Sequence, residues 1–245
     1  MKLSDIKLKP PKILLYGKFG SGKTAFALTG GSVVQYIDLD GGLLTGLTLK
    51  DQWIEERKKV DILSCLEEDR TKALAFRKAK SYIESIADQC SKGTYPFKVL
   101  VIDSLTRLSE YGMRGILDAN GLLGKNPRLQ DWVVRDIMFK EILLAMMSMN
   151  IAVLLLAHDQ IEDDGEGGQV IVPSIQGKAL PPLLNTYFDE ILYLRARSIA
   201  QGKTQYIIEN RSASGLKVRT RSNFENFFDV NLGLKVFLKA LTYEI

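Results

Sequence analysis

Eight consecutive residues near the start of the chain have the types and spacing needed to hold a chain of phosphates. Residues 17–24 read GKFGSGKT and fit the pattern G-x-x-x-x-G-K-[ST]. In this pattern glycines let backbone N–H groups curl around phosphate oxygens, the lysine reaches the β and γ phosphates, and the final hydroxyl binds Mg²⁺. A chance glycine-rich turn would match it on the order of one time in a hundred chains. The predicted phosphate-binding residues are Gly17, Lys18, Phe19, Gly20, Ser21, Gly22, Lys23 and Thr24.

A carboxylate at the end of an apolar run completes the expected metal site. Asp103 directly follows the run VLVI at residues 99–102. Phosphate-loop enzymes hold Mg²⁺ through a carboxylate at this position, whereas an isolated aspartate after a strand is often only a cap. Its pairing with the glycine-rich loop favours the metal role. Thr24 and Asp103 are therefore the predicted metal ligands, and Lys23 is a predicted catalytic residue.

Hydrolysis of a phosphate chain also needs a group that orients the attacking water, and a carboxylate is the usual one. Many such enzymes place a glutamate directly after the magnesium aspartate, where this chain has Ser104. We therefore expect the base from another strand end, and Asp40 is the best placed. Its other interpretation is a turn residue before two glycines, and Asp38 and Glu110 are the reserve candidates.

The only histidine of the chain stands at a further strand end. His158 directly follows the apolar run 151–157, from which it could touch the γ-phosphate or the attacking water. The alternative is a polar residue that caps a strand at the rim of a sheet. Gln160 competes with it for the catalytic role.

Basic residues gather late in the chain. Residues 195–221 hold seven basic residues and one acid. This stretch could bind a polyanion, but basic residues also commonly protect an exposed sheet edge from pairing with other strands. Within them Lys217, Arg219 and Arg221 alternate, so a strand would point them to one face. Three roles are open for that face: it could stabilise transition-state charge at a neighbouring subunit's nucleotide, bind nucleic acid, or keep the sheet edge soluble. By contrast, residues 159–168 hold five acids and no base, and would repel phosphate.

These polar groups follow short apolar runs that alternate with helical patterns. Apolar spacing of three and four residues predicts helices within 75–90 and 134–149. The predicted strands are residues 12–16, 33–38, 99–102, 151–157 and 190–194, with antiparallel strands at 204–209 and 216–220. Alternating strands and helices imply right-handed crossovers, a largely parallel sheet and helices on both faces. In such sheets the ligand site gathers at the carboxyl ends of the strands.

Composition bounds the class of protein. The 245 residues carry a net charge of +4 and predict one domain, residues 12–245, behind a short basic arm at residues 1–11. No apolar run approaches the ~20 residues of a membrane-spanning helix, and the start does not read as a secretory signal. We therefore expect a cytoplasmic protein without membrane contact. Cys65 and Cys90 are expected to be packing residues.

Taken together, the motifs resemble those of the RecA-like ATPases, and most closely the phage-encoded nucleotide-binding branch that includes Sak-type single-strand annealing recombinases. The resemblance covers most of the chain. It rests on GKFGSGKT and on YIDLDGG, VLVIDSLTRL, LQDW, LLLAHDQ, the P-x-x-x-G-K of residues 173–178, FDEILYL and LKVR.

The resemblance implies a RecA-like three-layer core that binds ATP with Mg²⁺. It also implies that Asp40 activates water, although RecA itself has a glutamate there, and that Lys217 and Arg219 reach across a subunit boundary in a homo-oligomer. The segment after Gln160 would correspond to a DNA-binding loop, but it is acidic here. DNA contact is therefore expected from residues 195–221 or from Lys178.

The leading hypothesis is an ATP-hydrolysing oligomer that acts on single-stranded DNA in phage recombination, annealing or replication. One alternative is a nucleotide-gated interaction module of a replication complex, whose hydrolysis is slow. Another is a P-loop kinase acting on a small molecule, for which Arg70 and Arg128 could serve in a lid.

Overall fold

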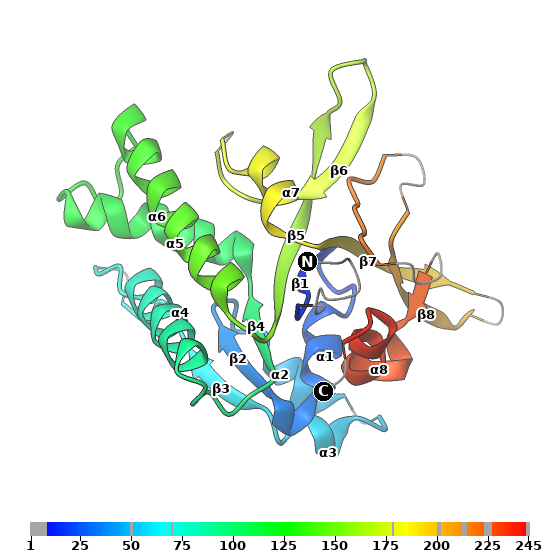
Figure 1. Cartoon of the computed structure of the whole chain (residues 1–245). Helices are drawn as coiled ribbons and strands as arrows, with labels where there is room; N and C mark the ends of the chain where they lie inside the picture. Colours follow the sequence, from blue (N-terminus) through cyan, green and yellow to red (C-terminus); the bar gives the residue numbers. More distant parts are fainter. Residues whose placement is uncertain are drawn as a thin grey trace, which may run out of the picture.

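The computed structural model describes residues 9–49, 51–69, 71–177, 179–199, 202–211, 215–222 and 227–243. Within these ranges nine strands form one sheet in the order β3-β2-β4-β5-β1-β7-β8-β9, with β6 paired to β5 (Figure 1). The strands are β1 Lys12–Gly17, β2 Val34–Asp38, β3 Asp61–Ser64, β4 Val99–Asp103, β5 Ala152–Asp163, β6 Gln169–Pro173, β7 Glu190–Ser198, β8 Thr204–Glu209 and β9 Phe227–Asp229.

The central strands run in one direction, which brings their carboxyl ends to one edge. All pairings from β3 across to β7 are parallel, whereas β8, β9 and β6 are antiparallel to their neighbours. Strand β5 lies between β1 and β4, so the glycine-rich loop and Asp103 are one strand apart. The register pairs Gly17 with His158 and Asp38 with Asp103. The polar groups that follow these strands therefore meet at one edge.

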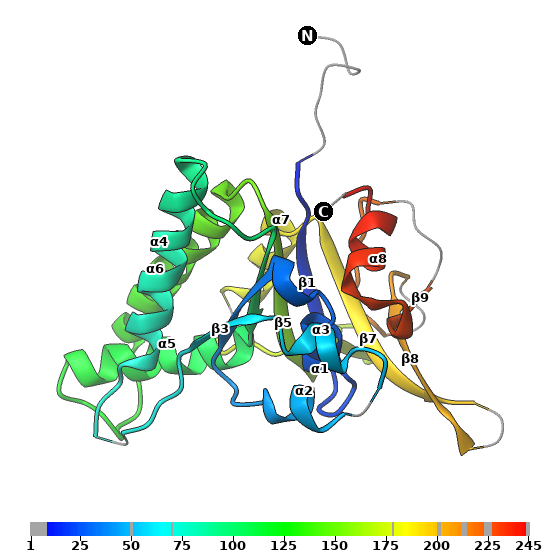
Figure 2. The same ribbon diagram turned by 90° about the horizontal axis from the view of Figure 1, so that it is seen from below.

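Helices cover both faces of this sheet. The described helices are α1 Lys23–Leu28, α2 Leu44–Thr48, α3 Ile54–Arg57, α4 Ala75–Ser91, α5 Leu105–Ala119, α6 Leu129–Ser148, α7 Leu184–Tyr187 and α8 Gly233–Ala240. Short 3-10 turns lie at Gly31–Val33, Pro181–Leu183 and Val230–Leu232. Figure 2 shows α4, α5 and α6 together on one side of the strands and α8 on the other.

The apolar runs of the strands are explained by burial on both faces. Along β1, Leu14 and Tyr16 join the apolar cluster under α4, α5 and α6. Ile13 and Leu15 point the other way and pack with α1 and α8. Because each face has its own helices, every residue of β1 is buried, and the strand reads as a continuous apolar run.

The predicted α/β class, the largely parallel sheet and the helices within 75–90 and 134–149 are confirmed. The predicted strand at residues 216–220 is wrong. Its residues make two isolated bridges, from Leu216 to Ile171 of β6 and from Arg219 to Ile191 of β7. The segment therefore crosses between two strands and does not run along either of them.

The acidic segment forms the end of a hairpin. Strand β5 continues past the buried core to Asp163 and pairs there with β6, in the register Asp159 to Pro173 and Asp163 to Gln169. The hairpin extends away from the body of the sheet (Figure 1). Its exposed acids would oppose, not attract, a phosphate backbone.

Three further expectations concern the chain as a whole. In the described ranges, none of the helices has both the length and the apolar character that crossing a bilayer requires. Cys65 and Cys90 are free thiols: Cys65 is buried in the apolar cluster under α4, and Cys90, on α4, is partly buried against it. Burial raises the pKa of Cys65 to about 11. Residues 1–8 of the predicted arm lie outside the described residues, while the Pro11 carbonyl accepts the Val153 N–H at 3.1 Å.

The packing under α6 gives a stability test. Phe139 is fully buried, and its ring stacks on Phe76 at 5.9 Å between centroids. Because the space cannot collapse fully, Phe139→Ala is expected to lower the free energy of unfolding by about 3–5 kcal/mol in urea denaturation. Leu144→Ala on the same helix, where the side chain is 59% exposed, should change it by less than about 0.5 kcal/mol. Equal effects of the two changes would contradict this account of the core.

Candidate functional site

The glycine-rich loop joins the end of β1 to the start of α1. Gly20 and Gly22 have φ of 75° and 97°, which glycine adopts readily, so the loop folds back and presents its N–H groups at a helix start. Lys23 is buried, and its Nζ donates to the carbonyls of Gly17 and Lys18 at 2.7 and 2.9 Å. Burial lowers the pKa of Lys23. The loop thus has the shape of a phosphate cradle, with its amine held against the loop carbonyls.

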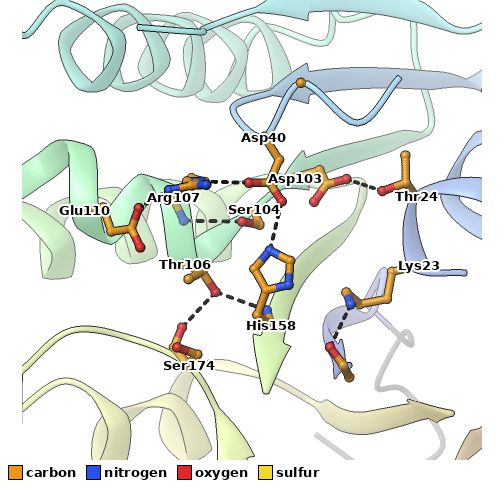
Figure 3. A network of polar contacts seen from close by, with 12 residues as sticks. Lys23, Thr24, Asp40, Asp103, Ser104, Thr106, Arg107, Glu110, His158 and Ser174 are labelled. Carbon is orange, nitrogen blue, oxygen red and sulfur yellow. Dashed lines mark hydrogen bonds and ion pairs between the residues drawn. The ribbon is translucent and has the colours of Figure 1, made fainter. Parts of the chain in front are cut away.

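Thr24 and Asp103, the predicted metal ligands, lie in contact. The Thr24 hydroxyl donates to Asp103 Oδ2 at 2.6 Å (Figure 3). Burial raises the pKa of Asp103, while hydrogen bonds from Thr24 and Tyr36 act in the opposite direction. One hydroxyl and one carboxylate form the donor set that suits Mg²⁺ when phosphate oxygens and water supply the other ligands. The residues present therefore fit the implied metal.

Tyr36 is a member of the site that the sequence analysis missed. Its ring is fully buried on β2, and its hydroxyl donates to the same Asp103 oxygen that Thr24 contacts. Burial and the Asp103 carboxylate raise the pKa of Tyr36 well above its usual value, so the phenol keeps the proton that it donates. Hydrogen bonds of this kind fix the orientation of a metal-binding carboxylate. Because Tyr36 sits inside an apolar strand, its type alone gave no signal of this contact.

Asp40 lies between two cationic or potentially cationic side chains (Figure 3). Arg107 Nε donates to Asp40 Oδ1 at 3.0 Å, and His158 Nε2 lies 2.9 Å from Asp40 Oδ2. Burial would raise the pKa of Asp40, but the hydrogen bonds and charges of His158 and Arg107 outweigh it and hold this pKa below the usual value. Asp40 is therefore a carboxylate at neutral pH.

The two reserve carboxylates make different contacts. Asp38 Oδ1 accepts the N–H groups of Asp40 and Gly41 at 3.2 and 2.9 Å, so it shapes the turn that carries Asp40. Glu110 accepts from Arg107 Nη1 at 2.5 Å. Asp38 thus contacts the backbone around Asp40, and Glu110 contacts Arg107, so neither carboxylate is hydrogen-bonded to the Asp40 side chain directly. Arg107, which contacts both Asp40 and Glu110, was not singled out from the sequence because Asp40 lies 67 residues away in the chain.

A threonine connects the middle of β5 to the segment that follows β6. The Thr106 hydroxyl accepts the backbone N–H of His158 at 3.0 Å and donates to the Ser174 carbonyl at 2.9 Å. Gln160, the competitor of His158, instead donates to Glu162 at 2.7 Å. His158 is thus the β5 residue that reaches Asp40, but its predicted position at a strand end is wrong, because β5 continues past it to Asp163 and pairs there with β6.

The structure does not bring Lys217 or Arg219 into this group. Lys217 is exposed, and its carbonyl accepts from the Tyr16 hydroxyl at 3.0 Å. Arg219 Nη1 donates to the Asn185 carbonyl in α7, and Arg221 pairs with Asp189 at 2.7 Å. The common face expected from a strand is therefore not formed.

The remaining basic candidates lie elsewhere. Lys178 and Arg70 lie outside the described residues. Arg128 precedes α6 and pairs with Asp131 at 3.0 Å, so its guanidinium serves the start of that helix. Arg195, from the basic stretch, pairs with Glu209 at 2.7 Å.

Cavities lined by described residues adjoin the loop on two sides. The larger, about 530 Å³, is lined by Lys23, Thr24, Asp40, Asp103 and His158 among others. The smaller, about 350 Å³, lies between the loop and β7 and is lined by Lys18, Phe19, Tyr193 and Arg195 among others. The larger cavity therefore holds the predicted phosphate, metal and water-orienting groups together.

The contact between Tyr36 and Asp103 gives a test of the metal site. Tyr36→Phe removes the hydroxyl and leaves Asp103 free to turn, so we expect the Mg²⁺ concentration for half-maximal nucleotide hydrolysis to rise about tenfold. Tyr95→Phe is the matched control, because that hydroxyl donates to Gln35 at 2.9 Å, away from Asp103. Thermal unfolding would show that both variants are folded. The same Mg²⁺ requirement in both would remove Tyr36 from the metal site.

Comparison with known proteins identifies the broader class. Among solved structures, an ATPase from the type III secretion system of pathogenic bacteria matches with a TM-score of 0.50 and 14% identity. The match covers 76% of this chain but about half, 51%, of that structure, and it supports the RecA-like ATPase fold alone. No curated protein matches the chain. A family model described as an AAA domain matches residues 9–222. Because this match covers most of the chain, the protein belongs to the AAA domain family and carries an AAA-type P-loop ATPase domain.

Proposed function

We propose that the protein is a Mg²⁺-dependent ATPase in which Asp40 orients the water that attacks the γ-phosphate. The observation that supports this most is the Asp40 carboxylate, which Arg107 and His158 hold in the same cavity as Lys23 and Thr24. Phosphate binding, metal binding and water orientation require these residue types within one site.

In this mechanism the loop N–H groups and Lys23 Nζ bind the triphosphate, and the lysine exchanges its loop carbonyls for phosphate oxygens. Thr24 and Asp103 would hold the metal, which would supply positive charge to neutralise the phosphates. Asp40 has lone pairs beyond those facing Arg107 and His158, so it can accept a water proton. Its lowered pKa makes it a better orienter of water than a base, which predicts slow turnover.

Two substitutions separate binding from hydrolysis. Lys23→Ala should abolish nucleotide binding, since it removes the cation that faces the phosphates. Asp40→Asn should keep binding and lower the hydrolysis rate at least about 100-fold, because the neutral amide replaces one acceptor oxygen by a donor and orients the attacking water poorly. Asp61→Asn is the control, because this exposed residue lies on the edge strand β3 and its carboxylate accepts a hydrogen bond from Gln35 of β2. Binding is measured with a fluorescent ATP analogue, and hydrolysis as released phosphate. Unchanged hydrolysis in Asp40→Asn would exclude this residue from the reaction.

We further propose that the partner is single-stranded DNA, as in phage recombination or annealing, and that it lies over the smaller cavity. Phe19 on its wall is 92% exposed, which offers a stacking surface for a base. Lys18 and Arg195 line the same cavity, and Arg197 lies two residues further along β7 on the same face as Arg195. The contact is assigned to this basic surface because the β5–β6 hairpin is acidic.

The DNA proposal has a salt-dependent test. Arg197→Ala and Lys203→Ala should each reduce the slope of log affinity against log salt concentration by about 0.7, the value for one lost phosphate contact on a single strand. Arg77→Ala, on the exposed side of α4, should leave the slope unchanged. Affinity is measured by fluorescence anisotropy of an oligonucleotide, beside ATP turnover with and without it. If salt-dependent binding and stimulation are both absent, the DNA role is lost and the ATPase role stands.

A homo-oligomer with a composite ATP site belongs to the same proposal. Lys217 is exposed and free to face a neighbouring subunit, whereas Arg219 would first have to leave the Asn185 carbonyl. The single-domain organisation from residue 12 and a cytoplasmic location are proposed with it. The competing function, a slow nucleotide-gated module, is favoured by the lowered pKa of Asp40 and by Ser104 in the position after Asp103.

A further inference from the structure

Two hairpins of the sheet carry charges of opposite sign. The β5–β6 hairpin has five acids and no base over residues 159–168. The β7–β8 hairpin has three bases and no acid over residues 195–208. We call these segments the acidic hairpin and the basic hairpin. Figure 1 shows that they extend from the sheet in different directions, so one molecule does not bring the opposite charges together.

The charges of the acidic hairpin are not balanced by neighbouring bases. Elsewhere on the surface opposite charges stand together, as on α4, where Lys92 Nζ lies 2.7 Å from Asp88. In the described part of the chain, no ion pair reaches the exposed acids at the end of the hairpin, which are Glu162, Asp163, Asp164 and Glu166. Like charges so close together repel one another, and an oppositely charged partner would relieve that repulsion.

The basic hairpin presents the opposite charge in the same way. Arg195 pairs with Glu209 at 2.7 Å, whereas Arg197 and Lys203 are exposed and have no acidic partner among the described residues. The register pairs Arg197 with Gln205, two residues after Lys203, so both cations lie on the same face of the hairpin. Two unbalanced cations therefore stand close together at its end.

Each hairpin also exposes a large apolar side chain beside its charges. Ile161 on β5 directly precedes Glu162 and is 65% exposed. Ile199 follows β7, is 42% exposed, and donates its backbone N–H to the Lys203 carbonyl at 2.8 Å. Contact surfaces between proteins combine apolar residues with a charged rim, and both hairpins offer this combination.

We propose that the acidic hairpin of one copy docks on the basic hairpin of a second copy. The two surfaces match in charge, and neither has a charged partner within the described part of its own chain. Every copy carries both halves of the contact, which is why we assign the partner to a second copy. Complementary charges of this kind orient two proteins as they meet.

The form of the contact determines the form of the assembly. Because the two surfaces differ, a pair of copies leaves one acidic and one basic hairpin free, so further copies add head to tail. Two hairpin ends make a small interface, below the ~1,200 Å² of stable complexes, so we expect weak association that salt disrupts. The contact requires neither nucleotide nor DNA and therefore goes beyond the proposed function.

Two variants reverse one surface each. Glu162→Lys with Glu166→Lys makes the acidic hairpin basic, while Asp163 and Asp164 are kept because they accept N–H groups of the turn. Arg197→Glu with Lys203→Glu makes the basic hairpin acidic. Self-association is measured by sedimentation velocity without nucleotide or DNA, at about 0.1 M and about 1 M salt, between which the screening length falls from about 10 to about 3 Å.

We expect the unaltered chain to sediment faster as its concentration rises at the lower salt concentration, and to lose this dependence at the higher one. Each variant alone should not self-associate, because both of its hairpins then carry the same sign. An equimolar mixture of the two variants should associate again, since every reversed surface meets an oppositely charged one. This recovery also shows that neither variant is misfolded.

A matched control separates the hairpins from net charge. Glu84→Lys with Asp88→Lys, on the exposed side of α4, changes the net charge as much as the reversed acidic hairpin does. This control should self-associate like the unaltered chain. Arg77→Glu with Lys92→Glu, also on exposed positions of that region, is the control for the reversed basic hairpin and should behave in the same way.

Four results would overturn the hairpin contact. They are an unaltered chain that does not self-associate at the lower salt concentration, self-association that persists in either reversed variant alone, a mixture that stays unassociated, and equal loss of association in the α4 controls. None of these results concerns nucleotide binding, hydrolysis or DNA affinity. Failure of the contact therefore leaves the proposed function to its own tests.

Discussion

One hydrogen bond joins the two motifs on which the whole site depends. The Thr24 hydroxyl meets Asp103 although 79 residues separate them in the chain. Their contact requires β1 and β4 to end at the same edge with β5 inserted between them. That alignment is fixed by strands buried on both faces, because shifting one strand by a residue would turn its apolar side chains toward the wrong helices. The packing of the core therefore also fixes the distance between Thr24 and Asp103 at the site.

Much of the fold and the centre of the site could be predicted from the sequence, because they depend on local patterns. A strand that is covered on both faces has an unbroken apolar sequence. The apolar run therefore predicts a strand at residues 12–16, and the structure has β1 at Lys12–Gly17. Helix α4 was recognised from a single apolar stripe. The phosphate loop and Asp103 follow such strands directly, so predicting the strands also placed these residues.

The remainder depends on contacts that no local pattern encodes. Strand β3 is an edge strand with a largely exposed sequence, and residues 216–220 bridge two different strands, so neither shows the expected alternation. Tyr36 reaches Asp103 on the neighbouring strand β4, and Arg107 of α5 reaches Asp40 after β2. The positions of their polar atoms follow from the tertiary structure, and only the assembled chain reveals that Asp40 is held from two sides.

The Thr106 hydroxyl has a mechanical consequence. The same oxygen receives the main chain of His158 and contacts the main chain of Ser174, just after β6. The Thr106 side chain therefore contacts both His158, which touches the Asp40 carboxylate, and Ser174, at the base of the β5–β6 hairpin. The Ser174 N–H also donates to the His158 carbonyl at 2.7 Å, so the two segments are joined directly as well. Displacing His158 would therefore require these contacts to break or the segment after β6 to move with it.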